Sequence, residues 1–281
     1  MICIRDLYFQ YKNSDRYALK DINLEIGEGE FVGVIGSSGS GKTTLTCVIN
    51  GVVPHYYEGD FYGSAVVGGL DTVTATPAQL SHVVGSVFQD IDGQMVASVV
   101  EDELLFGLEN FGVPRAEIAA RIEDALQTVG IPELRYRTIF SLSGGQKQKV
   151  AIAAIIALRP RLIVLDEPTG ELDPRSSRMI FDMLRRLNRE YGMTVVVVEQ
   201  KIMLLCEYVN RLLVMDEGAV LFDGDVHQVL ENTEDLRRVG VNVPRVTTLA
   251  NILRGRGLYE GPQPANLNEA EQMVRGVLRL D

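Results

Sequence analysis

Residues 36–43, which read GSSGSGKT, have the types and spacing of a loop that binds phosphate groups. They fill the pattern G-x-x-x-x-G-K-[ST]. Because glycine has no Cβ, successive backbone N–H groups can turn inward there and surround an anion. The Lys42 ammonium would reach the β- and γ-phosphates of a nucleotide, and the Thr43 hydroxyl would ligate Mg²⁺. A glycine turn with an incidental lysine is the alternative, but the apolar run at 31–35 and the helix-like sequence after the loop favour phosphate binding.

Two adjacent carboxylates, Asp166 and Glu167, follow the apolar run Leu162–Leu165, which predicts a buried strand. Successive side chains of a strand point to opposite sides, so the two acids can do different work. Asp166 would hold Mg²⁺ through its water shell, and Glu167 would orient or deprotonate an attacking water. Strand ends with two acids also occur without catalysis, so the pair alone leaves both interpretations open.

A second candidate anion site lies at residues 142–146, which read LSGGQ. Ser143 stands where an N-cap belongs, ahead of an alanine-rich helix predicted to end near Leu158. Gly144 and Gly145 would leave backbone donors bare at the start of that helix. A glycine-rich cap without a ligand is the alternative for this segment taken alone.

The elements that must position these residues alternate between buried strands and helices from residue 83 to residue 222, which predicts a mostly parallel sheet covered on both faces. The predicted strands are 2–9, 21–26, 31–35, 59–67, 83–88, 162–165, 194–198, 212–215 and 219–222. The predicted helices are one beginning at Lys42, then 98–108, 114–129, 143–158, 175–190, 225–230, 246–254 and 268–278.

Three local patterns add detail. Gly27–Gly29 predicts a hairpin turn between strands 21–26 and 31–35. Ser98 and Glu101 have the spacing of a capping box that opens the helix ending near Leu108. Tyr11, after the first strand, would stack on an adenine ring, or would simply be a half-buried residue at a strand end.

Composition limits the class of protein. The chain has 281 residues, so one large core with a smaller appendage is expected. A net charge of −11 argues against non-specific binding to nucleic acid or anionic lipid. No apolar run reaches the roughly 18–20 residues that span a bilayer, and the first residues lack a signal-peptide pattern. The three scattered cysteines, Cys3, Cys47 and Cys206, support neither disulfides nor a zinc site, so we expect free thiols in a reducing cytosol.

Residues 1–225 resemble the ATP-binding cassette family, the nucleotide-binding subunits of ABC transporters. The resemblance lies in the order of four features: the phosphate loop, Gln89, LSGGQ and the LDEPT of 165–169. The resemblance implies an α/β P-loop NTPase with a mostly parallel core sheet and an N-terminal antiparallel β subdomain. It also implies a helical signature subdomain at about 90–158 and a C-terminal helical dimerisation region at 226–281.

The same resemblance implies roles for residues. Glu167 would be catalytic, together with Gln200, Lys42 and Gln89. Mg²⁺ would be held by Thr43, Gln89 and Asp166. ATP would lie between the phosphate loop of one chain and LSGGQ of another, contacting Tyr11, Ser37, Ser38, Gly39, Ser40, Gly41, Lys42, Thr43, Thr44, Ser143, Gly144, Gly145 and Gln146.

Two departures from the family pattern stand out. Gln200 occupies the position where the family has a histidine that contacts the γ-phosphate and the attacking water. Its amide can donate and accept hydrogen bonds but cannot carry a proton, so hydrolysis survives if positioning the water matters more than proton transfer. A substitution introduced to trap ATP is the alternative. In addition, Gly170–Asp173 reads GELD where the family has S-x-L-D, so Glu171 adds charge near the dimer seam.

The stretches at 50–59 and 87–114 and the short C-terminal region resemble the ATPase subunits of energy-coupling factor (ECF) transporters, which import vitamins and trace metals in prokaryotes. This implies a second ATPase subunit (a copy or a paralogue) and integral membrane scaffold and substrate-binding subunits as partners, with no nucleic acid. We expect a cytoplasmic protein, peripheral on the inner face of the membrane. The acidic residues between Asp90 and Glu103 are either a solvated face or the contact surface for the membrane partner.

Two other functions remain open at this point. A non-transport cassette ATPase would show two cassettes, a long coiled-coil insertion or basic surfaces, and the sequence has none of these. A nucleotide-binding subunit with little catalysis is suggested by Gln200 and opposed by Lys42, Asp166 and Glu167.

Overall fold

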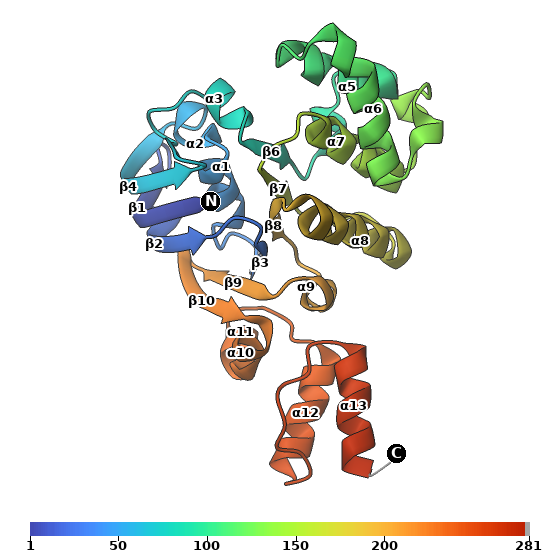
Figure 1. Ribbon diagram of the computed structural model, residues 1–281. Coiled ribbons are helices and arrows are strands. Elements are labelled where there is room, and N and C mark those ends of the chain that lie inside the picture. Colours follow the sequence, from blue (N-terminus) through green and yellow to red (C-terminus); the bar gives the residue numbers. More distant parts are fainter. Residues whose placement is uncertain (279–281) are drawn as a thin grey trace.

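Two β-sheets form the frame of the protein in the computed structural model, which describes residues 1–278 (Figure 1). The last three positions of the predicted 226–281 region lie outside the described residues. The strands are β1 (Ile2–Tyr11), β2 (Leu19–Ile26), β3 (Phe31–Gly36), β4 (Gly59–Val67), β5 (Leu70–Asp71), β6 (Val84–Val87), β7 (Leu162–Asp166), β8 (Thr194–Val198), β9 (Arg211–Asp216) and β10 (Ala219–Asp225).

Thirteen α-helices accompany the sheets within residues 1–278. They are α1 (Lys42–Ile49), α2 (Val52–His55), α3 (Pro77–Ser81), α4 (Ile91–Gln94), α5 (Val100–Asn110), α6 (Arg115–Val129), α7 (Gly144–Ala157), α8 (Pro174–Tyr191), α9 (Ile202–Tyr208), α10 (Val226–Glu231), α11 (Thr233–Arg238), α12 (Arg245–Gly255) and α13 (Leu267–Leu278). None of them is both long and apolar enough to cross a bilayer.

The larger sheet has the order β10-β9-β3-β8-β7-β6, and only its β10–β9 pair is antiparallel. Every residue of β7 and β8 is buried, as a parallel sheet covered on both faces requires. Alternate residues of β8 join two different apolar clusters: Val195 and Val197 pack with α8 and α9, and Val196 and Val198 pack with α1 and the smaller sheet. The predicted mostly parallel core sheet is confirmed.

The smaller sheet has the order β2-β1-β4-β5 and is antiparallel throughout, which confirms the predicted N-terminal antiparallel part. The predicted hairpin across Gly27–Gly29 is wrong, because β2 pairs with β1 in the smaller sheet and β3 lies in the larger one. Both edges of β3 are occupied, by β8 and by β9. The alternating burial of β2 fits a sheet with one solvated face, whereas β3 is buried along Phe31–Ile35.

Helices α4–α7 follow β6 and precede β7 in the chain, and α5, α6 and α7 lie at the upper right of Figure 1. An isolated bridge joins Val99 to Thr138. The predicted capping box is wrong: α5 begins without a side-chain cap. Glu103, rather than Ser98, reaches back over the helix start and accepts the backbone N–H groups of residues 96 and 97 at 2.9 and 2.7 Å. Glu101 is unavailable for capping because it pairs with Arg135 at 2.6 Å.

The C-terminal helices divide into two groups. Buried residues of α10 and α11 belong to the same apolar cluster as the parallel sheet, so this core continues past residue 225. Helices α12 and α13 lie apart at the bottom of Figure 1 and pack on each other through a separate cluster, made by Val246, Ala250, Ala270 and Met273. The division of the chain at 225/226 and the dimerising role of its last part stay predictions.

Candidate nucleotide site

The loop between β3 and α1 has the backbone conformation that an anion site needs. Gly39 and Gly41 have φ values of +79° and +99°. A Cβ on Gly41 would lie 2.6 Å from the carbonyl oxygen of Ala18, so only glycine fits there. Helix α1 starts with no side-chain cap, which leaves its first N–H groups facing the loop.

The Lys42 side chain folds back over this loop. It is 6% exposed, and its Nζ donates to the carbonyl oxygens of Gly36 and Ser37 at 3.0 and 2.7 Å. Burial lowers the pKa of Lys42, while Glu167 and Asp166 act in the opposite direction. A largely buried cation beside open backbone donors is an environment that favours a bound anion.

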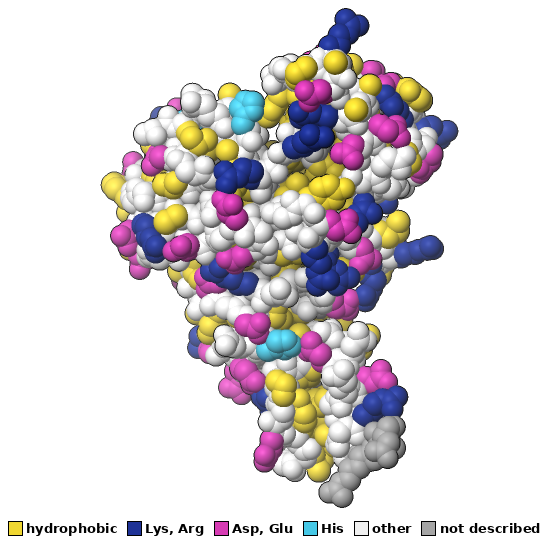
Figure 2. Space-filling model, viewed as in Figure 1, with side chains coloured by type: hydrophobic (Ala, Val, Ile, Leu, Met, Phe, Trp, Pro, Cys, Tyr) yellow, Lys and Arg dark blue, Asp and Glu magenta, His cyan; other side chains and the backbone are white. Residues whose placement is uncertain are grey.

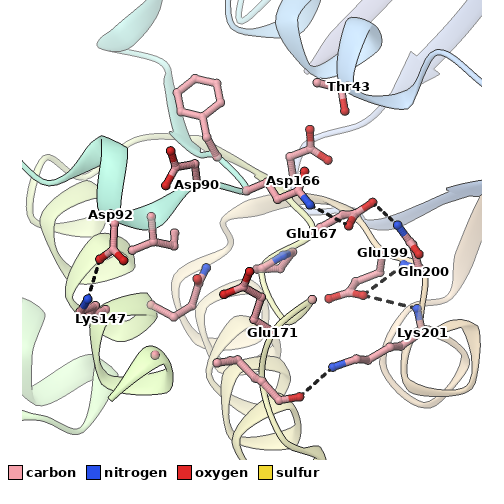
Figure 3. A pocket seen from close by; sticks show the side chains of 18 residues that line it. Thr43, Asp90, Asp92, Lys147, Asp166, Glu167, Glu171, Glu199, Gln200 and Lys201 are labelled. Atoms are coloured by element: carbon pink, nitrogen blue, oxygen red, sulfur yellow. Dashed lines mark hydrogen bonds and ion pairs between the residues drawn. The ribbon is translucent and has the colours of Figure 1, made fainter. Parts of the chain in front are cut away.

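The adjacent acids at the end of β7 have different surroundings (Figure 3). Asp166 is 5% exposed, and its burial raises its pKa against the lowering effect of the Thr43 hydroxyl. Glu167 has the unusual φ of +49° and accepts from the side-chain amides of Gln200 at 2.7 Å and Gln89 at 3.3 Å. Two amide donors therefore fix the orientation of the Glu167 carboxylate.

A cavity of about 860 Å³ brings six of the predicted site residues together: Thr43, Gln89, Gly144, Asp166, Glu167 and Gln200. Ser37 and Ser38 line a smaller cavity of about 210 Å³, which Gln200 also lines. Gln200 thus lies between the phosphate loop and the carboxylates.

Tyr11 lies beside α1 at the end of β1. Its hydroxyl is 3.0 Å from Thr44 Oγ1, and its ring packs edge-on against Phe9 and Tyr57 at centroid distances of 4.8 and 6.0 Å. Burial raises the pKa of Tyr11. These contacts fit both interpretations of this residue, so adenine stacking stays a prediction.

The LSGGQ residues begin α7, and the predicted N-cap at Ser143 is confirmed. Ser143 and Gln146 form a capping box, with Ser143 N–H donating to Gln146 Oε1 at 3.0 Å and Gln146 N–H donating to Ser143 Oγ at 3.4 Å. Within residues 1–278, no hydrogen bond joins this segment to the phosphate loop. Lys147, one residue further on, pairs with Asp92 of α4 at 2.6 Å.

Sequence reasoning places the end of strand 194–198 near the site but does not reveal what the neighbours of Gln200 contact. Glu199 is 1% exposed and accepts the Thr169 N–H at 2.9 Å and the Thr169 hydroxyl. Lys201 donates to the Leu172 carbonyl at 3.0 Å and to Ser177 Oγ at 3.1 Å. The only local signal is that three polar residues follow the buried strand 194–198, and it does not reveal partners that lie 24 to 30 residues away.

A strand, a phosphate loop and a helix, followed by two acids at the end of another parallel strand, define a P-loop nucleotide-binding protein. Comparison with known proteins names the family. The profile described as "ABC transporter" matches residues 19–170, and the chain belongs to that family.

Relatives and solved structures agree with this assignment. The chain is 41% identical over 260 residues to a putative ABC transporter ATP-binding protein of Pyrococcus horikoshii, covering 92% of each chain. It is 39% identical over 273 residues to the energy-coupling factor transporter ATP-binding protein EcfA1 of Caldanaerobacter subterraneus subsp. tengcongensis, covering 97% of this chain and 95% of the other.

Among structures, cbiO1 from Clostridium perfringens, part of the ABC transporter complex cbiONQ, is similar with a TM-score of 0.75 and 31% identity, over 88% of this chain and 97% of that one. The ATP-binding cassette MJ0796, a dimer bound to ADP and Pi in a post-hydrolysis state, gives a TM-score of 0.70 and 28% identity, over 80% and 99%. This chain is therefore an ATP-binding, ATP-hydrolysing transporter cassette, of a family whose members dimerise.

Proposed function

We propose that this ATPase drives an ECF-type importer, coupling ATP binding and hydrolysis at a dimer interface to uptake of a vitamin or trace metal. The observation that carries the proposal is the similarity to EcfA1, which extends over 97% of this chain and so includes the C-terminal region. The similarity to cbiO1, which belongs to a transporter complex, supports it.

Each ATP lies between the phosphate loop of one chain and residues 143–146 of a second ATPase subunit, which is either a copy or a paralogue. Two features support this arrangement: the segment makes no hydrogen bond to its own loop within residues 1–278, and the similar cassette MJ0796 is a dimer with ADP and Pi. ATP closes the pair because it binds both surfaces, and hydrolysis with loss of phosphate releases them. Helices α12 and α13 hold the ATPase subunits together between cycles.

The residues beside the loop fit Mg²⁺. Thr43, Asp166 and Gln89 offer hydroxyl, carboxylate and amide oxygens, the ligand type that this ion prefers. The raised pKa of buried Asp166 indicates a carboxylate that a nearby cation would stabilise in its charged form. Within residues 1–278 no three His, Cys, Asp or Glu side chains gather, which suits an ion bound largely by phosphate and water. When bound, Mg²⁺ would neutralise phosphate charge.

The protein's own residues divide the remaining work. Lys42 would exchange the carbonyls of Gly36 and Ser37 for phosphate oxygens. Glu167, oriented by Gln89 and Gln200, would accept the proton of the attacking water. Because a neutral amide cannot take that proton, Gln200 would contribute by positioning alone.

Membrane partners dock on the helical part. A groove of about 670 Å³ between α5 and α6 is lined by apolar side chains from Leu105 to Ile122 and by charged ones, among them Glu101, Glu109 and Arg135. Most of the acidic residues between Asp90 and Glu103 already have intramolecular partners, which leaves the apolar side chains of this groove as the proposed contact surface. This docking, with integral scaffold and substrate-binding subunits, places the chain on the cytoplasmic face of the membrane.

Nucleic acid is not part of the proposal. Figure 2 shows Lys and Arg side chains interspersed with Asp and Glu over the face drawn, rather than gathered in one patch, and the net charge is −11.

A nucleotide-binding subunit with weak catalysis is a second candidate, favoured by Gln200. The ATPase of another ABC transporter type is a third, favoured by the similarity to the putative ABC transporter ATP-binding protein of Pyrococcus horikoshii. Measuring phosphate release by the complex, with Glu167→Gln as the control, separates weak catalysis from the first proposal. A turnover no higher than that of the control favours the weakly catalytic subunit.

The experiment that tests the ECF assignment is to purify the tagged protein from its own membranes and identify what accompanies it. A small integral substrate-binding protein and a larger scaffold are expected. Recovery of a different set of transmembrane subunits, without a separate substrate-binding membrane protein, contradicts the assignment.

A further inference from the structure

Two loops meet beside the carboxylates, one formed by residues 167–173 after β7 and the other by residues 199–201 after β8 (Figure 3). Their strands are parallel neighbours, with Asp166 opposite Val198. The central residue of the second loop, Gln200, donates to Glu167 of the first. Glu199 and Lys201, on either side of Gln200, also contact the first loop, and neither has a role in binding the nucleotide.

Glu199 holds the 167–173 loop at Thr169. Its Oε1 accepts the backbone N–H and the hydroxyl of Thr169, which is fully buried, and its Oε2 accepts the N–H groups of Gln200 and Lys201 at 3.1 and 3.4 Å. Four hydrogen bonds therefore surround a carboxylate that is 1% exposed, which is what a buried charge requires.

Lys201 holds the same loop at Thr169 and Leu172, in the tight turn formed by residues 169–172. An ammonium has three donors, and here all three have acceptors: the carbonyl oxygens of Thr169 and Leu172 and the hydroxyl of Ser177. Ser177 belongs to α8 and is 1% exposed, so Lys201 ties the turn to the start of that helix. The turn itself is closed by the Leu172 N–H, which donates to the same Thr169 carbonyl at 3.1 Å.

The turn is joined directly to Glu167. The Gly170 N–H donates to the Glu167 carbonyl at 3.1 Å, so a shift of the turn moves the peptide that carries this side chain. Glu167 also has a φ of +49°, which residues other than glycine rarely adopt and which the surrounding contacts must hold in place.

We propose that Lys201 is a positioning residue for ATP hydrolysis: by donating to Thr169, Leu172 and Ser177 it fixes the 169–172 turn and thereby the place of the Glu167 carboxylate. The two loops then behave as one rigid unit around Gln200. This inference rests on the proposed role of Glu167, and it adds a residue that does not itself touch the nucleotide.

The decisive variant is Lys201→Met, because methionine keeps much of the apolar stem but has no donor. It removes the donor that joins the Thr169 and Leu172 carbonyls and the Ser177 hydroxyl to the 199–201 loop, while the bonds within the 169–172 turn remain. We expect kcat to fall about 10- to 100-fold, since a displacement of about 1 Å at a reacting group can cost about that much. The KM for ATP should change by less than about threefold, because the phosphate loop is untouched.

The test uses the full-length chain and two measurements: phosphate release against ATP concentration, and hydrogen–deuterium exchange of peptides covering residues 167–173. Exchange in that segment should rise in Lys201→Met and stay constant at 36–44. Lys201→Arg keeps a cation with donors and should recover part of the lost kcat. Lys20→Met makes the same substitution in β2, outside the site, and should match the wild type in both measurements.

Unchanged exchange across 167–173 in Lys201→Met, or raised exchange with an unchanged kcat, overturns the proposal. A loss of kcat that Lys201→Arg does not relieve also counts against it. If the wild type itself releases phosphate no faster than Glu167→Gln, the proposed role of Glu167 fails instead, and the exchange measurement then decides alone whether Lys201 holds the turn.

Discussion

The N-termini of α1 and α7 are both rich in glycine, yet they differ in how their backbone donors are used. Helix α1 begins at a positive-φ glycine with no side-chain cap, and a buried lysine lies beside it. Helix α7 begins with a capping box in which Ser143 and Gln146 satisfy each other. The first terminus therefore offers its donors to an anion within a single chain. At the second, the cap occupies the Gln146 N–H, and within residues 1–278 the Gly144 and Gly145 N–H groups have no hydrogen-bond partner.

This difference suggests an order of events. We expect ATP to bind first at α1, beside the buried lysine, and then to meet the Gly144 and Gly145 N–H groups of α7 in a second chain. The following predictions test this contrast.

The largest effect is expected from Glu167→Gln, which leaves both helix termini intact and removes the proposed base. General-base catalysis typically contributes about 10²- to 10⁴-fold, so we expect phosphate release to fall by that range. The variant should still bind ATP, and the unhydrolysed ATP should hold α1 of one chain and α7 of the other together in a dimer. Size-exclusion chromatography with Mg²⁺ and ATP should then show a dimer, and a monomer under these conditions would contradict the shared site.

The next effect is expected from Lys42→Ala, which damages the α1 terminus alone. Hydrogen bonds to charged groups contribute about 1.5–3 kcal/mol, so ATP affinity should fall about 10- to 100-fold. Titration with a fluorescent ATP analogue measures this on the single chain. The thermal stability of the protein without nucleotide should also fall, because the variant removes the buried donor of the Gly36 and Ser37 carbonyl oxygens.

How much of this contrast could be predicted from the sequence depends on how local each contact is. The phosphate loop and the Ser143 cap are contiguous patterns, so their residues were identified directly. The Gly27–Gly29 hairpin was misjudged because the partners of β3 lie in β8 and β9, more than 150 residues away. The hydrogen bonds of Lys201 were missed for a related reason: they depend on β7 and β8 being neighbours, which no local pattern states.

The capping box at Ser98 failed for local reasons rather than distance: the N-cap position is Val99, one residue further on, and Glu101 is bound elsewhere. The pattern was present, but Glu101 has a stronger partner in Arg135, and Glu103 takes its place over the helix start. A local pattern predicts a contact only when no charged group elsewhere in the fold competes for the same side chain.

A smaller effect is expected from Ser143→Ala, which opens the α7 cap and removes its hydroxyl. ATP binding by the single chain should be unchanged, because α1 is intact. The free energy of unfolding should fall by about 0.5–2 kcal/mol, as for other lost caps. If the Ser143 hydroxyl contacts the ATP bound to the second chain, turnover of the dimer should fall about tenfold or more. Denaturant unfolding and phosphate release measure the two effects separately. Weaker ATP binding by the monomer would show that α7 belongs to the same nucleotide site as α1 within one chain.

The smallest effect is expected from Gln200→His, which leaves both termini untouched and changes only the residue between them. If Gln200 acts by positioning Glu167, a neutral imidazole can replace the amide, and turnover at pH 8 should stay within about threefold of the wild type. A new dependence on pH should appear at or above the ordinary imidazole pKa of about 6.5, since the Glu167 carboxylate favours the protonated ring, which pairs with it and weakens it as a base. Turnover would then fall as the pH falls through that value, more steeply than in the wild type. A pH profile of phosphate release from 5.5 to 8.5 (roughly one unit or more on either side of that pKa) measures this.

A rise in the turnover of Gln200→His of tenfold or more at pH 8 (about 1.4 kcal/mol in the barrier) would instead indicate that proton transfer at position 200 limits the natural chain. Gln200 would then mark a weakened site.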